Sequence, residues 1–344
     1  MKNNNCALVY SLLKIPGIGP AKVLKFIESK QFNLEEIQKN PLQIKKMITN
    51  KRYVDEDIDW FKLRTKSQEA IERNLRAGIK CICALDEDFP QRLLEETNPC
   101  VLFFYRGNIE ILKNSKFAAV VGSRMLFDSK KNSSKYSKEF SDKILLNTKK
   151  ISTVLSNSGY TIVSGLALGC DTMGHEGSLA SNNKPNIAVL CGGLDSIYPL
   201  ENRTLANDIL SNNGLLISED SIGTPISKQG FILRDRIQAM LSDFLVVGYT
   251  DCCSGTIYAC AECIKRNKYV ILSAESSFSK EDIYKNKIVP EKYLEQYDWE
   301  KMIKIDFNNT DYFKGKITHL KFRNNLKSEN NKKIIMPQLS LFDF

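Results

Sequence analysis

The sequence predicts an α/β protein with an extended Rossmann-like parallel sheet and helices on both faces. Short apolar runs rich in Val and Ile begin at residues 117, 161, 187 and 244 of the 344-residue chain. Each run ends in a glycine-containing turn, and helix-length segments separate one run from the next. Because such runs are apolar throughout, they indicate strands buried on both faces, which is typical of parallel sheets.

Two further parts flank this sheet. Residues 1–75 have a helical pattern and predict a small N-terminal helical domain, whereas residues 80–275 carry the strand–helix alternation. Residues 276–344 lose that alternation, become basic and rich in Asn, and are expected to form a partly disordered tail. We find neither a signal peptide nor an apolar run that could span a bilayer, and therefore expect a cytoplasmic protein without membrane contact.

Charge and cysteine content restrict the partners only loosely. Lys and Arg outnumber Asp and Glu by 49 to 40, a net charge of +9 that permits a nucleic-acid partner without requiring one. Of the ten cysteines, the one cluster in sequence is Cys252, Cys253, Cys260 and Cys263. No nearby histidine completes a zinc ligand set, so we interpret these residues as reduced thiols and expect neither metal nor cofactor.

The turns that end the apolar runs form the predicted ligand site. Ligands of parallel sheets bind at the carboxyl ends of the strands, where glycine lets backbone N–H groups approach an anion. The residues expected at this phosphate-binding edge are Gly122, Ser123, Arg124, Ser164, Gly165, Ser254, Gly255 and Thr256. His175 offers a general base, but no nucleophile or metal partner accompanies it, so no catalytic residue is predicted.

A second element combines one aromatic residue with three cations: Lys228, Phe231, Arg234 and Arg236. Single-stranded nucleic acids are bound in this way, because bases stack on the ring while the cations contact phosphates. From spacing alone, a phenylalanine that anchors a loop and arginines in salt bridges explain the pattern equally well.

The turn between residues 12 and 22 lies between two apolar helical stretches and contains Gly17 and Gly19. It has the pattern of a helix-hairpin-helix, whose amides hold a DNA phosphate, but it equally fits a simple connection between packed helices. The chain contains neither a G-x-G-x-x-G turn after a strand nor a P-loop, which disfavours dinucleotide binding and P-loop NTPase activity.

Taken in order, these motifs resemble the DNA-processing protein A family, also called DprA or Smf. The matching segments are 88–93, 102–108, 120–124, 164–171, 192–195, 231–236 and 254–256, so the resemblance covers about residues 80 to 274. It implies a non-enzymatic protein that binds single-stranded DNA, loads the RecA recombinase, notably in natural transformation, and dimerises through its Rossmann domain. By matching position, Arg124, Lys228, Phe231, Arg234 and Arg236 would line the DNA pocket.

Three features depart from the family pattern. Leu168 stands where an arginine is usual, and Asp235 stands where an asparagine is usual, so one cation is lost and one carboxylate is gained. The winged-helix domain that ends many members is not recognisable here. Affinity for DNA, or the identity of the ligand, is therefore open.

The main alternative is a nucleotide-binding or nucleotide-hydrolysing Rossmann protein. The phosphoribohydrolases resemble this chain but carry a glutamate three residues after a threonine equivalent to Thr256. Ala259 occupies that position, so hydrolysis loses its acid, whereas a nucleotide sensor remains open.

The chain ends in a short apolar peptide, Gln338, Leu339, Ser340, Leu341 and Phe342, that resembles the motif by which bacterial proteins dock into the replication sliding clamp. A polar linker would present Leu341 and Phe342 to an apolar groove, while Gln338 would supply hydrogen bonds. The alternative is a terminus that packs on its own domain. A third functional hypothesis is therefore a replication-associated adaptor.

Overall fold

The computed structural model describes residues 2–29, 59–94, 98–124, 136–252, 254–285 and 297–330. Its helices are α1 (Lys2–Leu13), α2 (Pro20–Glu28), α5 (Trp60–Arg76), α6 (Lys138–Asn157), α7 (Cys170–Leu179), α8 (Arg203–Ser211), α9 (Lys228–Leu241), α10 (Thr256–Lys265), α11 (Lys280–Lys285) and α12 (Thr310–Asn330). Its strands are β1 (Lys80–Cys83), β2 (Leu102–Gly107), β3 (Phe117–Val121), β4 (Thr161–Ser164), β5 (Asn186–Val189), β6 (Leu215–Ser218), β7 (Phe244–Val247), β8 (Tyr269–Ser273) and β9 (Met302–Ile305).

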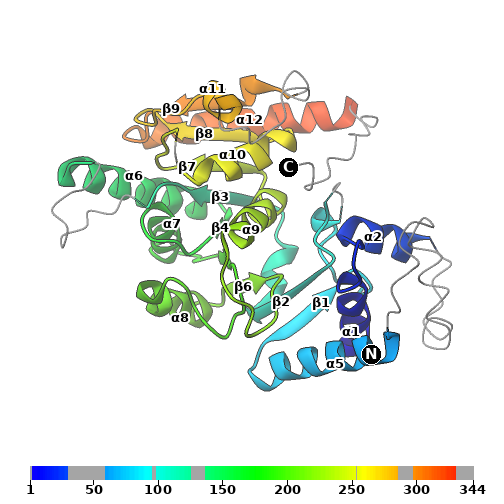
Figure 1. Cartoon of the computed structure of the whole chain (residues 1–344). Coiled ribbons are helices and arrows are strands. Elements are labelled where there is room, and N and C mark those ends of the chain that lie inside the picture. Colours follow the sequence, from blue (N-terminus) through cyan, green and yellow to red (C-terminus); the bar gives the residue numbers. More distant parts are fainter. Residues whose placement is uncertain are drawn as a thin grey trace.

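The strands form one nine-stranded sheet in the order β1-β2-β6-β5-β4-β3-β7-β8-β9 (Figure 1). From β6 to β9 every neighbouring pair is parallel, whereas β1 and β2 add to one edge in antiparallel fashion. The order reverses beside β3, which lies between β4 and β7 although it precedes both in the chain. The predicted α/β class with a parallel Rossmann-like sheet is confirmed.

Helices cover both faces of the sheet, because successive residues of a strand point to opposite sides. In β3, Ala118 and Val120 pack in one apolar cluster with Ile151 of α6. Ala119 and Val121 pack in another with residues of α10 on the opposite face. This two-sided burial explains why the strand sequences are continuously apolar.

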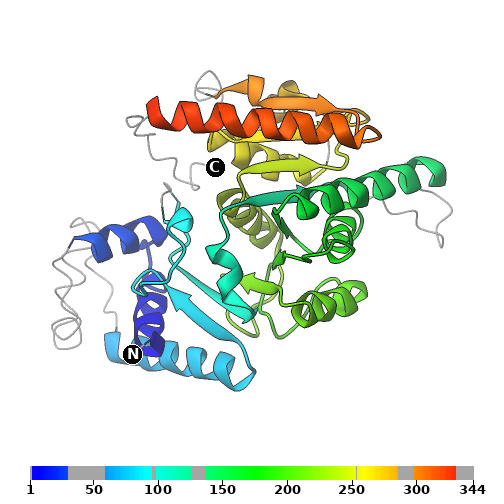
Figure 2. The same cartoon turned by 180° about the vertical axis from the view of Figure 1, so that it is seen from behind.

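The strand–helix alternation, which the sequence pattern ended at residue 275, continues in the structure to α12. Strand β9 pairs parallel with β8, and α12 buries Phe313 and Ile317 in the cluster that contains Ile151 of α6. Figure 2 shows α12 in red along the face that also carries α6. Strand β9 was not predicted because it is an edge strand of only four residues with an exposed Lys304. Edge strands are commonly short and charged, so they lack the continuous apolar pattern of buried strands.

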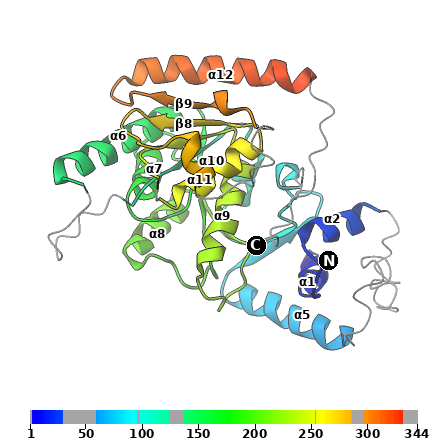
Figure 3. The same cartoon turned by 45° about the horizontal axis from the view of Figure 1, so that its top comes forward.

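The N-terminal helices lie beside the antiparallel edge of the sheet (Figure 3). Helix α1 contacts both α5 and β1, and Tyr10 meets Phe104 of β2 edge to face with ring centroids 5.9 Å apart. In the turn between α1 and α2, Lys22 donates a hydrogen bond to the Gly17 carbonyl at 2.8 Å. Within the described part of the chain, no helix combines the length and hydropathy needed to cross a membrane.

Candidate nucleic-acid interface

A cavity of about 740 Å³ opens at the carboxyl ends of β3 and β7. Its walls come from the turn after β3, the first turns of α9 and the start of α10. This volume is typical of sites that hold a small ligand or part of a larger one. The location agrees with the general rule that open α/β sheets bind ligands where the strand order reverses.

A chain of hydroxyl groups joins the turn after β3 to the start of α10. Ser123 Oγ donates to Ser254 Oγ at 3.2 Å, and Ser254 Oγ donates to Thr256 Oγ1 at 3.0 Å. The Thr256 N–H also donates to Ser254 Oγ, and Gly255 beside it is exposed, with open space where a Cβ would lie. Hydroxyls and the first N–H groups of a helix together favour an anion at this wall.

Two cations from different elements line the cavity. Arg124 follows β3 and Lys228 begins α9, and both are exposed. Among the residues that the structure describes, neither cation forms an ion pair, in contrast to Arg234 and Arg236. Arg124 and Lys228 are thus available to contact phosphates.

Phe231 supplies the predicted aromatic surface, one turn after Lys228 on α9. The structure adds a second ring that the sequence prediction missed: Tyr198, whose ring centroid lies 6.2 Å from that of Phe231. Tyr198 is 44% exposed, although large aromatic side chains are usually well buried. The two neighbouring rings form a surface on which bases could stack.

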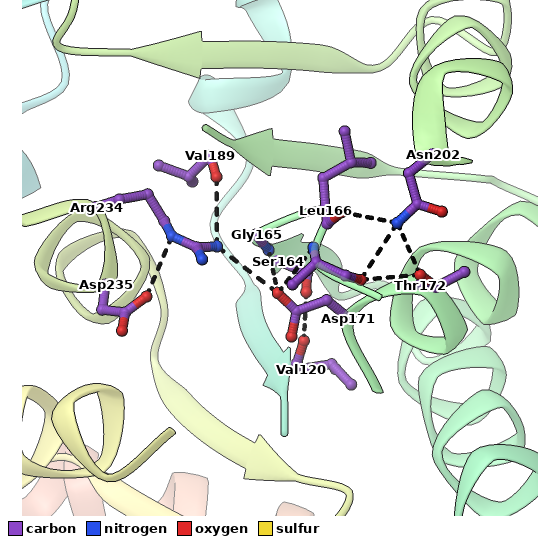
Figure 4. Close-up of polar contacts among 11 residues, drawn as sticks. Val120, Ser164, Gly165, Leu166, Asp171, Thr172, Val189, Asn202, Arg234 and Asp235 are labelled. Atoms are coloured by element: carbon purple, nitrogen blue, oxygen red, sulfur yellow. Dashed lines mark hydrogen bonds and ion pairs between the residues drawn. The ribbon is translucent and has the colours of Figure 1, made fainter. Parts of the chain in front are cut away.

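Arg234 lies at the floor of the cavity between two carboxylates (Figure 4). Its Nη1 is 3.7 Å from Asp171 Oδ2, and its Nε is 3.2 Å from Asp235 Oδ1. A Cβ on Gly165 would lie 1.0 Å from Arg234 Nη1, so only glycine leaves room for this guanidinium. The charge of Arg234 is therefore compensated within the protein.

Burial acts on both carboxylates that contact Arg234. It raises the pKa of Asp171, and it raises the pKa of Asp235 to about 7, while the charge of Arg234 opposes both shifts. The Asp171 carboxylate also accepts hydrogen bonds from the N–H groups of Gly165 and Ala167, at 3.2 and 3.4 Å. Asp171 thereby fixes the loop after β4, and Asp235 brings a titratable group to the cavity.

Other residues singled out from the sequence lie away from the cavity. Ser164 is fully buried and donates to the Val120 carbonyl at 2.6 Å, which ties β4 to β3. Arg236 is buried on the far side of α9, where it bonds to Glu219 at 2.5 Å and to the Pro99 carbonyl at 2.9 Å. Neither residue lines the cavity, nor does Gly165, which leaves space for Arg234 and donates its N–H to Asp171.

His175 is also a structural residue in this arrangement. It is fully buried in α7, with Nδ1 2.7 Å from Asn186 Oδ1, and burial lowers its pKa to about 4. It does not line the cavity. Leu168, which replaces the arginine usual in the family, does not line the cavity either.

Tyr136 and Asp251 complete one wall, and the sequence prediction did not include them. The Tyr136 hydroxyl donates to Asp251 Oδ2, and burial together with this carboxylate raises the pKa of the phenol. Asp251 follows β7, so the rule that sites form at strand carboxyl ends would have found it. Tyr136 precedes α6 and belongs to no motif, so nothing in the sequence indicated it.

The fold and this cavity define a Rossmann-like α/β protein whose strand carboxyl ends carry a cavity lined by hydroxyl groups, cations and an aromatic ring. The family model of DNA recombination-mediator protein A matches residues 80–293, which is more than half of the chain, and the chain belongs to that family.

Two features singled out from the sequence, Cys253 and the peptide 338–342 that resembles a clamp-binding motif, lie outside the described residues.

Individual proteins agree with this assignment. The chain is 35% identical to the DNA processing protein DprA of Streptococcus pneumoniae over 54% of this chain and 60% of that protein. It is 28% identical to the protein Smf of a Synechocystis strain over 72% of this chain and 59% of the relative. The chain thus aligns with about 60% of the length of these relatives. The solved structure of the Streptococcus pneumoniae DprA has the same fold, with a TM-score of 0.59 and 24% identity over 87% of this chain and 99% of the other.

Proposed function

We propose that the chain binds single-stranded DNA in the cavity at the carboxyl ends of β3 and β7. The observation that carries this proposal is the convergence of the Phe231 ring with two exposed cations, Arg124 and Lys228, that form no ion pair with any residue the structure describes. A duplex keeps its bases stacked inside, whereas a single strand offers base faces to the ring and phosphates to the cations. The hydroxyl chain from Ser123 to Thr256 would hold one phosphate beside the start of α10.

Within this proposal the protein acts in DNA recombination as a non-enzymatic mediator. Membership of the recombination-mediator family supports that role, and a homodimer that loads the RecA recombinase is its expected form. The peptide Gln338–Phe342 would recruit the protein to the sliding clamp.

A titration of the full chain with a fluorescent single strand and the matching duplex, followed by anisotropy at two salt concentrations, tests the binding proposal. We expect the single strand to bind more tightly and its affinity to fall with salt, because phosphate contacts release counterions. Equal affinity for both forms, or no binding to either, would remove the proposed function.

A nucleotide sensor is the second candidate, because the cavity contains compensating charges. Its lining includes Asp171, Asp235 and Asp251 beside Arg124, Lys228 and Arg234. A site for a long polyanion is expected to be positive, whereas one nucleotide can be bound with both signs present. Mononucleotides added to the same titration separate the candidates: efficient competition at micromolar concentration favours the sensor, and weak competition favours the single strand.

A further inference from the structure

A cluster of thiols and one carboxylate lies between α1 and β1, far from the cavity. Cys6 Sγ of α1, Cys83 Sγ of β1 and an Asp86 carboxylate oxygen all lie within 4.8 Å of one another, and all three residues are buried. Among the described residues, no other group of three such ligands lies this close together. Cys81 belongs to the same buried cluster as Cys6 and Cys83.

The backbone explains why these groups meet. Residues 81 and 83 are two apart in a strand, so both side chains point to the same face, and that face packs against α1. Asp86 follows in the turn after β1, and its Oδ2 accepts a hydrogen bond from the Cys83 N–H at 2.9 Å. The Asn5 amide donates to its Oδ1 at 3.3 Å. The carboxylate is therefore held from both sides.

We infer that Cys6, Cys81, Cys83 and Asp86 form a structural zinc site that joins the N-terminal helices to the sheet. Zinc takes four thiolate, imidazole or carboxylate ligands in a tetrahedron, with Zn–S bonds of about 2.3 Å and Zn–O bonds of about 2.1 Å. These bond lengths place neighbouring ligand atoms roughly 3.5–3.8 Å apart. Cys6 Sγ and Asp86 Oδ2 are 4.0 Å apart, so a small contraction brings them to coordinating distance.

The order of ligands along the chain explains why spacing alone did not reveal the site. Cys6 and Asp86 are separated by 80 residues, and Cys81 with Cys83 forms a C-x-C rather than a C-x-x-C. Each oxygen of the Asp86 carboxylate accepts a hydrogen bond from a neighbouring group. In metal sites, ligating carboxylates are typically oriented by such hydrogen bonds. Coordination would tie α1 to β1 and stabilise the folded form relative to the unfolded chain.

The test uses the full chain purified under reducing conditions without chelator. Elemental analysis is expected to find about one zinc per chain. After metal removal, titration with Co²⁺ should give the thiolate-to-cobalt charge-transfer band and the intense visible bands of tetrahedral coordination. Added Zn²⁺ should displace the cobalt and raise the melting temperature.

Variants then locate the site. Cys83→Ser and Asp86→Asn are expected to lose metal, whereas Cys263→Ser, which alters a buried free cysteine of α10, is expected to retain it. Because a substituted core thiol can impair folding, the cobalt spectrum of the unaltered chain is the decisive measurement. Absence of the charge-transfer band overturns the inference. Equal metal loss in Cys263→Ser, or a disulfide between Cys6 and Cys83 together with no cobalt uptake, also overturns it.

Discussion

Arg234 and Asp171 form a buried ion pair at the floor of the cavity, with Nη1 and Oδ2 3.7 Å apart. This contact joins α9 to the first turn of α7 (Figure 4). Together with Asp235 it compensates the arginine, so the floor presents no net positive charge to a phosphate. We therefore expect the exposed cations Arg124 and Lys228 to determine the affinity of the cavity for an anion.

Substitution of Arg124 by alanine is expected to weaken single-strand binding on every sequence alike. Loss of one phosphate contact should also reduce the slope of log K against log salt by about 0.7 for a single strand. Anisotropy titrations at three salt concentrations measure both quantities. Arg76→Ala removes an exposed arginine on α5 and serves as the matched control, for which neither value should change. An Arg124 variant with the parent's slope would contradict the site.

Substitution of Phe231 by alanine should cost roughly 1–3 kcal/mol of binding free energy, because one base loses its stacking partner. Tyr198→Ala is expected to weaken binding as well, since its ring lies beside that of Phe231. The comparison is Phe61→Ala, which removes an 81% exposed phenylalanine from α5. If Phe61→Ala and Phe231→Ala bind single strands equally well, the aromatic surface has been assigned incorrectly.

The titration of Asp235 should make stability depend on pH. Burial raises its pKa from 3.8 to about 7, so the folded protein binds more protons than the unfolded chain between these values. The contribution of this group to stability is therefore present at low pH and is lost as pH rises through about 7. Asp235→Asn removes this dependence, so the stability of the variant relative to the parent should rise between pH 3.8 and about 7 and stay constant above that range.

Urea denaturation at several pH values measures this difference. Asp208→Asn changes an exposed aspartate of α8 and should follow the parent at every pH. If the free energy of unfolding changes with pH in the same way in both variants, Asp235 does not titrate in this range.

Arg236→Ala is expected to affect folding rather than binding. It would leave Glu219 without the guanidinium that contacts it, and breaking a buried pair typically costs about 3 kcal/mol or more. Chemical denaturation should show the loss, while the folded fraction binds single strands like the parent. A selective loss of DNA affinity at unchanged stability would place Arg236 in the binding site instead.

Deletion of residues 338–344 should abolish binding to the sliding clamp and leave single-strand affinity unchanged. The reason is that the apolar side chains of the peptide would fill a groove on the clamp, whereas the cavity lies elsewhere in the chain. Surface plasmon resonance with immobilised clamp provides the measurement. Unchanged binding after the deletion, or no binding by the full chain, would exclude this peptide as the docking element.

The parallel sheet could be predicted from the sequence, because runs such as 117–121 and 244–247 are apolar at every position, as expected for short strands covered on both faces. The sequence also placed Ser123, Arg124 and Thr256 at one edge, since the carboxyl ends of parallel strands meet there. Such patterns involve residues that are neighbours in the chain, so they can be identified from the sequence without knowledge of the fold.

Only the tertiary structure separated Arg234 from Arg236. The two residues are two apart on a helix and therefore point to different sides, one toward Asp171 and the other toward Glu219. Tyr198 and the ligand cluster at Cys6 likewise depend on contacts between segments distant in the chain. Spacing records which residues are present, but packing decides which carboxylate, ring or thiol each of them meets.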